Sequence, residues 1–252
     1  MGLLNKLGIG NSGNASRNVS RPTPGSGSSG QQRPGAVPAV VIGESRTTEV
    51  TETNRVSNGL KEFLWNLDGL GRGTLLDLVP AWQTTLNFFI ERGFRVTSDD
   101  LLRSWKDFMV EEEQRLKNAA TATEAIDLTP AGRAARFVQA NIQYSAASFD
   151  AVLLWDVLDY LEPAVAKQTV GCLTEVLRPG GIIFAMFHSK KPERFQRYRV
   201  ADSNTLQVIG AKPLCPAQRV YQNREIQELF GRFRTVKSFV GRDQLRESLF
   251  VK

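Results

Sequence analysis

Four polar side chains stand where apolar runs of the sequence end, and their types can bind a ligand or move a proton. Asp77 follows "TLL", Asp100 follows "FRVTSD", Asp156 follows "FDAVLLW", and His188 ends "IIFAMFH". The unperturbed pKa of histidine lies near neutrality, so His188 is a candidate general base for an acceptor hydroxyl. A lone histidine is also often structural, and an aspartate that ends a strand often caps the next turn. Both interpretations stay open for His188 and Asp156.

Composition excludes several classes of site. The chain has 252 residues, of which 41% are hydrophobic and 23% charged, as in a globular protein. Cys172 and Cys215 stand far apart in no metal or redox spacing, and with a single histidine they predict no zinc site. No apolar run approaches the roughly 18 residues of a membrane helix. The start, "MGLLNKLGIGN", is too short and polar for a secretory signal, so a cytoplasmic location is expected.

Charge and composition divide the chain into a tail, residues 1–50, and a domain, residues 51–252. The segment 11–38 is rich in Gly, Ser, Asn and Pro, so we expect the tail to be disordered. The first residues of the tail include four apolar side chains at roughly helical spacing, Leu3, Leu4, Leu7 and Ile9. They form either a docking motif for a protein partner or a frayed terminus. Residues 44–185 carry a net charge of −6 and residues 186–252 carry +8. The acidic middle argues against an extended nucleic-acid track.

Apolar periodicity then alternates between strands and helices. Leu60, Phe63, Leu64 and Leu67 follow the spacing of one helix face, and "TLLDLV" is apolar enough for a strand buried on both sides. The expected strands are 74–79, 94–98, 135–141, 148–156 and 182–188, followed by a hairpin at 193–210 and a closing strand pair around Gly241. The expected helices cover 60–67, a segment from Thr84 or Thr85 to Gly93, 99–120, a segment from Pro163, and 223–233. This pattern predicts a doubly wound α/β fold with helices on both faces of a mostly parallel sheet.

At this point the residues resemble a known family. "FDAVLLWDVLDYL" followed by "LTEVLRPGGIIFAMFH" looks like the fourth-strand and fifth-strand signatures of class I S-adenosylmethionine-dependent methyltransferases. The match runs in order and spacing from about Leu60 to the C-terminus. The resemblance implies a seven-stranded, mostly parallel Rossmann-like sheet that closes with an antiparallel C-terminal strand pair. It also implies S-adenosylmethionine as the cofactor, bound along the carboxyl ends of the strands.

The resemblance also assigns roles to residues around that cofactor. Asp77 matches the acidic residue at the end of the first strand, and Asp100 falls where the family has a carboxylate for the ribose hydroxyls. Asp99 is the alternative ribose carboxylate, and Asp100 could instead cap the following helix. Asn141 stands where an aspartate often contacts the adenine amino group, and its amide oxygen can still accept that hydrogen bond.

One stretch departs from the family. The three glycines that should follow the first-strand acid are replaced by Val79, Ala81 and Gln83, with Pro80 and Trp82 between them. Glycine permits positive φ angles and close approach of the backbone to the cofactor, whereas valine tolerates positive φ poorly. Either the loop takes another shape and still holds the cofactor, or the cofactor is lost and Val79 and Trp82 fill the vacated space.

The fourth strand and the segment after His188 offer an acceptor site. Trp155 and Asp156 close the fourth strand, where the family places the transferred methyl group, although both could be packing or capping residues. The segment 188–199 interleaves five basic residues with Phe195 and Tyr198. In the family this loop often lies over the acceptor, so the resemblance implies a small or anionic acceptor; a solvated hairpin is the alternative.

Three functions therefore stay open. The first is an S-adenosylmethionine-dependent methyltransferase, in which positioning supplies most of the catalysis. The second is a catalytically inactive protein of the same fold that serves as a binding or regulatory module. A nucleotide-dependent dehydrogenase is a distant third, because its glycine-rich phosphate loop is equally missing.

Overall fold

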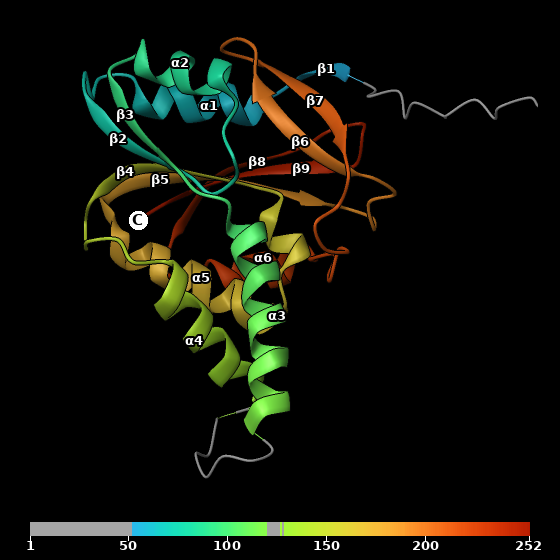
Figure 1. Cartoon of the computed structure of the whole chain (residues 1–252). Coiled ribbons are helices and arrows are strands. Elements are labelled where there is room, and N and C mark those ends of the chain that lie inside the picture. Colours follow the sequence, from blue (N-terminus) through green and yellow to red (C-terminus); the bar gives the residue numbers. More distant parts are fainter. Residues whose placement is uncertain (1–51, 120–126, 128) are drawn as a thin grey trace, which may run out of the picture. The chain divides into compact units, whose positions relative to one another are not determined.

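The computed structural model describes residues 52–119, 127 and 129–252, all within one compact unit. Its centre is a six-stranded sheet with the strand order β3-β2-β4-β5-β9-β8 (Figure 1). These strands are β2 (Gly73–Asp77), β3 (Phe94–Ser98), β4 (Phe149–Trp155), β5 (Leu177–His188), β8 (Arg234–Val240) and β9 (Leu245–Val251). Strands β3, β2, β4 and β5 are parallel, and β9 runs antiparallel to both β5 and β8. The predicted α/β sheet and its antiparallel C-terminal pair are confirmed.

Helices cover both faces of this sheet. Helices α1 (Asn58–Leu67) and α2 (Gln83–Ile90) lie on one face, and α3 (Leu101–Ala119), α4 (Pro130–Asn141), α5 (Pro163–Val176) and α6 (Asn223–Leu229) lie on the other (Figure 1). A 3₁₀ turn, η1 (Val157–Tyr160), follows β4 directly. The layers agree with a doubly wound sheet, and Pro163 is the first residue of α5 as expected.

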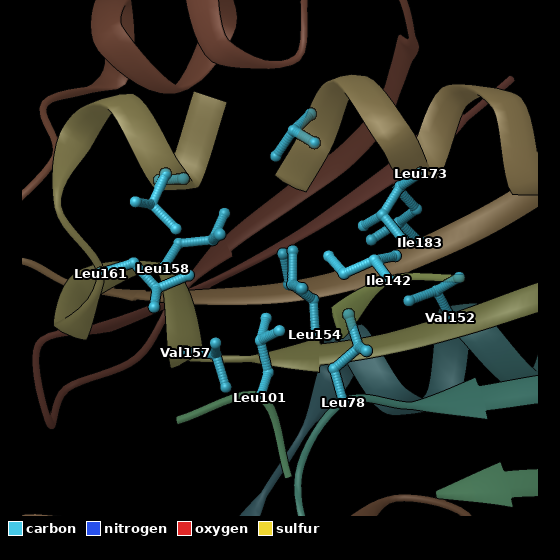
Figure 2. Close-up of a cluster of buried hydrophobic side chains, with 14 of the residues drawn as sticks. Leu78, Leu101, Ile142, Val152, Leu154, Val157, Leu158, Leu161, Leu173 and Ile183 are labelled. Carbon is cyan, nitrogen blue, oxygen red and sulfur yellow. The ribbon is translucent and has the colours of Figure 1, made fainter. Parts of the chain in front are cut away.

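Alternation along the central strands builds two cores. Leu76, Val152 and Ile183 point to the face of α3–α6, whereas their neighbours Leu75 and Leu153 point to the face of α1 and α2. Each of these five side chains is fully buried. Figure 2 shows the first core, where Leu78, Leu154 and Leu173 reach the same apolar space from different elements. Because both faces are buried, these strands read as unbroken apolar runs in the sequence.

The predicted strand 135–141 is wrong, because this segment belongs to helix α4. Thr129 caps the helix by accepting a hydrogen bond from the Gly132 amide, and Pro130 is its first residue. Its buried residues are Ala134, Phe137 and Val138, which follow helical rather than strand spacing. Consequently the central sheet has six strands rather than seven within the described residues.

A second, three-stranded antiparallel sheet was not predicted as such. The predicted hairpin is present as β6 (Phe195–Val200) and β7 (Thr205–Ala211), and β1 (Glu52–Val56) pairs with β7. The buried side chains of Tyr198 and Val200 pack into the core on the face of α1 and α2. The small sheet therefore lies on that face, beside α1 and α2 (Figure 1).

The described residues contain neither a membrane-spanning helix nor a cluster of metal ligands. No described helix combines the length and the apolar content that a bilayer crossing needs. No group of His, Cys, Asp and Glu side chains in this part of the chain has the geometry of a metal site. The tail, residues 1–50, lies outside the described residues.

Candidate functional site

A cleft of about 650 Å³ opens at the carboxyl ends of β2 and β3. Its walls come from the loop after β2, from the β3 end and the start of α3, from β6, and from the chain after β7. The lining residues are 79–81, 98–100, Leu102, Arg103, Asp156, 195–198, Ala211, Lys212 and Leu214. Carboxyl ends of strands at a switch in strand order are where open α/β sheets bind ligands, and the volume is that of a small-molecule site.

The loop after β2 takes an ordinary backbone shape without glycine. No residue between Leu78 and Gln83 has a positive φ angle. The Ala81 amide donates to Ser98 Oγ at 3.0 Å, and Ser98 Oγ donates to the Val79 carbonyl at 3.1 Å. Arg197 Nη2 donates to the Pro80 carbonyl at 2.6 Å. The loop's polar backbone groups are thus bonded to β3 and β6, while Val79, Pro80 and Ala81 still line the open cleft.

Asp77 lies behind this loop in a sealed corner. Its carboxylate is 1% exposed, and its Oδ1 accepts hydrogen bonds from Trp155 Nε1 at 2.8 Å and from the Val79 amide at 3.2 Å. Its Oδ2 is buried without a hydrogen-bond partner among the described residues. Burial raises the pKa of Asp77 to about 7, although the Trp155 hydrogen bond opposes the rise. Asp100 lines the cleft, whereas Asp77, which the resemblance places beside the same cofactor, does not.

Trp155 closes that corner. Its indole is 1% exposed, stacks on the Tyr198 ring with centroids 5.6 Å apart, and meets the Phe184 ring edge-on. Its φ is +48°, a left-handed conformation that a bulky residue adopts only where the surroundings enforce it. Here the Nε1 bond to Asp77 and the stack on Tyr198 supply that enforcement. Trp155 therefore faces Asp77 and the core, and it does not line the cleft.

The two aspartates after β3 divide their roles. Asp100 Oδ1 accepts from the Arg103 amide at 3.0 Å, and its Oδ2 lies 3.5 Å from Arg103 Nε. Asp100 thus starts helix α3, as one of its two interpretations foresaw. The exposed Asp99 side chain lines the cleft, and partial burial raises the pKa of its carboxyl. Its amide donates to the Asp77 carbonyl at 2.9 Å, which holds the β3 end against β2.

Asn141, the expected adenine contact, lies elsewhere. It ends helix α4, and its side-chain amide donates to the Phe137 carbonyl at 3.0 Å one turn earlier. It does not line the cleft. Of the residues that the resemblance assigned to the cofactor, the structure brings Val79, Ala81 and Asp100 to the cleft, and it leaves Asp77, Asn141 and Trp155 outside.

Asp156 and His188 form part of a buried polar cluster beside the cleft. Asp156 lines the cleft and accepts a hydrogen bond from the Tyr198 hydroxyl at 3.0 Å. His188 Nδ1 lies 2.9 Å from Asp159 Oδ2 and 3.8 Å from Asp156 Oδ2. The same Asp159 oxygen accepts from the His188 amide at 2.7 Å, so this carboxylate fixes both the backbone and the ring of the histidine. His188 thus stands behind Asp156 and does not itself line the cleft.

The electrostatics of this cluster favour protonated forms. Burial raises the pKa of Asp156 to about 7, the nearby charge of Asp159 adds to the rise, and His188 opposes it. Burial alone would lower the pKa of His188, but its hydrogen bond to Asp159 and the charges of Asp156 and Asp159 raise it above its ordinary value. Burial raises the pKa of Tyr198 well above its usual range. Protons near neutral pH are therefore held within the Asp156–His188–Asp159 group.

The basic segment after β5 splits between two places. Arg197 and Arg199 extend over the Trp82 ring, with guanidinium carbons 4.5 and 5.6 Å from its centroid. Trp82 therefore packs against β6. It does not fill the cleft, although the interpretation in which the cofactor is lost required it to do so. Lys190, Lys191 and Arg194 instead line a separate hollow of about 350 Å³ beside His188.

Lys212 was not singled out in the sequence, whereas Arg197 and Tyr198 belong to the segment 188–199 that the sequence offered as an acceptor site. Arg197, Tyr198 and Lys212 belong to the small sheet or follow it. The alternation of β6 was the available signal, since it separates Tyr198 from Arg197 on opposite sides of the strand. The alternation does not predict that this sheet packs against β4 and against the loop after β2.

Comparison with known proteins gave structural neighbours only. No protein-family model matches the chain, and no curated protein matches it. A 1,6-didemethyltoxoflavin-N1-methyltransferase of Burkholderia thailandensis, solved with S-adenosylhomocysteine, is similar at 19% identity and a TM-score of 0.46, over 78% of this chain and 79% of that one. An S-adenosylmethionine-dependent methyltransferase of Mesorhizobium loti is similar at 14% identity and a TM-score of 0.44, over 76% of this chain and 96% of that one. Independently of these neighbours, the sheet order and the strand directions give this chain a doubly wound, Rossmann-like α/β fold with an antiparallel closing strand pair.

Proposed function

We propose that this chain is an S-adenosylmethionine-dependent methyltransferase whose cofactor occupies the open cleft through a different set of residues from the one the family resemblance implies. The observation that carries the proposal is the cleft itself. It stays open at the switch in strand order, although every glycine of the family's loop has been replaced. A fold that had lost its ligand and repacked would be expected to fill this space.

The chemistry of the cleft walls supports such a ligand. S-adenosylmethionine carries ribose hydroxyls, an apolar adenine, a cationic sulfonium and a terminal carboxylate. Asp99 offers a carboxylate to the ribose, and Val79 and Leu102 offer apolar surface to the adenine. Arg197 and Lys212 supply positive charge for the terminal carboxylate. Asp77, Asn141 and Trp155, which the resemblance also nominated, take no part in this set.

When bound, the cofactor would supply an electrophilic methyl group on sulfur. The chain's own contribution is to orient an acceptor and to take its proton. Asp156 is the group on the cleft wall that can do so, since the Tyr198 hydroxyl fixes its Oδ2 and His188 stands 3.8 Å behind it. His188 is then a positioning residue that stabilises the charge of Asp156. A small acceptor with an anionic group is the substrate class that the basic segment 188–199 favours.

Calorimetric titration with S-adenosylmethionine tests the proposal. We expect micromolar binding by the wild type and roughly tenfold weaker binding by Asp99→Asn, because a charged hydrogen-bond acceptor is lost. Asp107→Asn is the matched control, since Asp107 is an exposed aspartate of α3 outside the cleft. Absence of heat at millimolar cofactor would end the proposal.

The second candidate is a catalytically inactive binding module, and one observation favours it. Asp77, the acid that the resemblance places nearest the cofactor, is sealed by the Trp155 indole. This candidate expects no rise in the thermal midpoint with S-adenosylmethionine, whereas a ligand of the native state must raise it. If the chain is a binding module, Asp156 has no catalytic role. The variant Asp156→Asn should then leave any measured binding function unchanged.

A further inference from the structure

The hollow beside His188 is separate from the cleft and has its own walls. It is lined by residues of the segment 188–196 and by Asp243 and Gln244 of the turn between β8 and β9. Gln196 lines both the hollow and the cleft, so the two spaces adjoin. The buried pair of Asp156 and His188 stands between them, with Asp156 on the cleft side and His188 on the side of the hollow.

Positive charge dominates the hollow. Lys190, Lys191 and Arg194 are exposed at its rim, and no ion pair within 4 Å engages any of the three among the described residues. Glu193 and Asp243 also line it, but Asp243 forms an ion pair with Arg55. The basic side chains thus exceed the carboxylates that remain to offset them, and a solvated space of this kind attracts an anion.

His188 gives the hollow a fixed, buried donor. Its side chain is largely buried, and its Nδ1 is turned inward to Asp159. A carboxylate can only accept, so we place the hydrogen on Nδ1, and Nε2 is then the ring nitrogen that remains available to a ligand in the hollow that His188 lines. In the imidazolium form this Nε2–H donates to an anionic oxygen. The tie of Nδ1 to Asp159 holds the ring in that orientation before any ligand arrives.

From these contacts we propose that the hollow is an anion site for the phosphate group of a small molecule. The three basic side chains of the rim neutralise the charge, and His188 donates to one oxygen from the floor. A tetrahedral dianion suits several donors converging from different directions, which makes a phosphate a better match than a flat carboxylate. The link between the hollow and the cleft rests on the proposed function: the phosphate belongs to the methyl acceptor, which extends past Gln196 from the hollow into the cleft.

Inorganic phosphate is the probe, titrated into the full chain at constant ionic strength and followed by calorimetry. We expect saturable binding that weakens at least tenfold in the triple variant Lys190→Gln, Lys191→Gln, Arg194→Gln. Lys167→Gln is the control, because Lys167 is exposed on α5 away from the hollow, and it should bind as the wild type does. Equal effects of phosphate and chloride, or unchanged binding by the triple variant, would overturn the proposal. Since S-adenosylmethionine binding is measured separately, failure of one site does not imply failure of the other.

Inorganic sulfate separates the role of His188 from that of the rim, because its charge stays constant across the pH range in which histidine titrates. The groups that face His188 are Asp156, Asp159, Tyr160, Asp243 and Arg246. We expect sulfate binding to weaken as His188 loses its proton on raising the pH, and His188→Gln to remove most of this dependence. A His188→Gln variant with the wild-type pH profile would show that His188 is not the donor.

Discussion

Two neighbouring strands of one sheet end at aspartates that differ in their exposure to solvent. Asp77 ends β2 and Asp99 follows β3, and the two strands are paired so that Asp77 lies opposite Ser98. Asp77 is 1% exposed and bonded to Trp155, whereas Asp99 is exposed and lines the cleft. Both aspartates stand near the end of a strand, Asp77 as its last residue and Asp99 one position beyond it. What differs is the neighbour: β4 brings Trp155 to Asp77, and nothing comparable among the described residues covers Asp99.

The largest expected effect comes from opening the sealed corner. Trp155→Ala removes a fully buried indole and leaves a cavity, so we expect the free energy of unfolding to fall by about 3–5 kcal/mol. Urea denaturation measures it. Trp65→Ala is the matched control, because the Trp65 side chain is 73% exposed, and its cost should stay within about 0.5 kcal/mol. Equal losses in the two variants would mean that the Trp155–Tyr198 stack does not hold the corner.

The next effect is the pH dependence of stability that comes from the buried carboxyl group of Asp77. The pKa of Asp77 is about 7 in the folded chain and near 3.8 when unfolded, so its stabilising contribution is complete below about pH 4. That contribution is lost as pH rises through 7, by up to about 4 kcal/mol for a shift of about three pKa units. We therefore expect the free energy of unfolding, measured by urea denaturation, to be higher near pH 5.5 than near pH 8.

Asp77→Asn tests that assignment, since a neutral amide can still accept from Trp155 Nε1. Over the same pH range its free energy of unfolding should fall less than that of the wild type. The buried Asp156 titrates with the same sign, so part of the pH dependence should persist in the variant. Unchanged pH dependence in Asp77→Asn would locate the proton elsewhere.

A smaller effect separates the two aspartates at the open strand end. Asp100→Ala removes the cap of α3, which should cost about 1 kcal/mol of stability. Since the Asp100 carboxylate is already engaged by Arg103, the affinity for S-adenosylmethionine should stay close to that of the wild type. Asp99→Asn is expected to do the reverse, with little loss of stability and weaker binding. Thermal midpoints and calorimetry on both variants distinguish the two roles.

Local sequence signals predicted much of the fold but not the contacts of the sealed corner. Periodicity and caps sufficed for the parallel strands, for Pro163 at the start of α5 and for the closing β8–β9 pair, because these signals are local. The segment 135–141 was misassigned because a short apolar run does not by itself separate strand from helix. The Asp77–Trp155 bond joins residues 78 positions apart, so no local pattern could contain it.

The smallest expected effect tests what holds the glycine-free loop in place. The Trp82 ring packs against the guanidinium groups of Arg197 and Arg199. Arg197 also donates a hydrogen bond to the Pro80 carbonyl, so the small sheet holds the loop in place through contacts outside the cleft. Trp82→Leu keeps apolar bulk and removes the aromatic face, which should cost about 0.5–1 kcal/mol at this half-buried position. Affinity for S-adenosylmethionine should not change, because Trp82 does not line the cleft. A loss of stability as large as that of Trp155→Ala would instead mean that Trp82 fills a former cofactor site. Both strand ends would then be closed by a buried tryptophan.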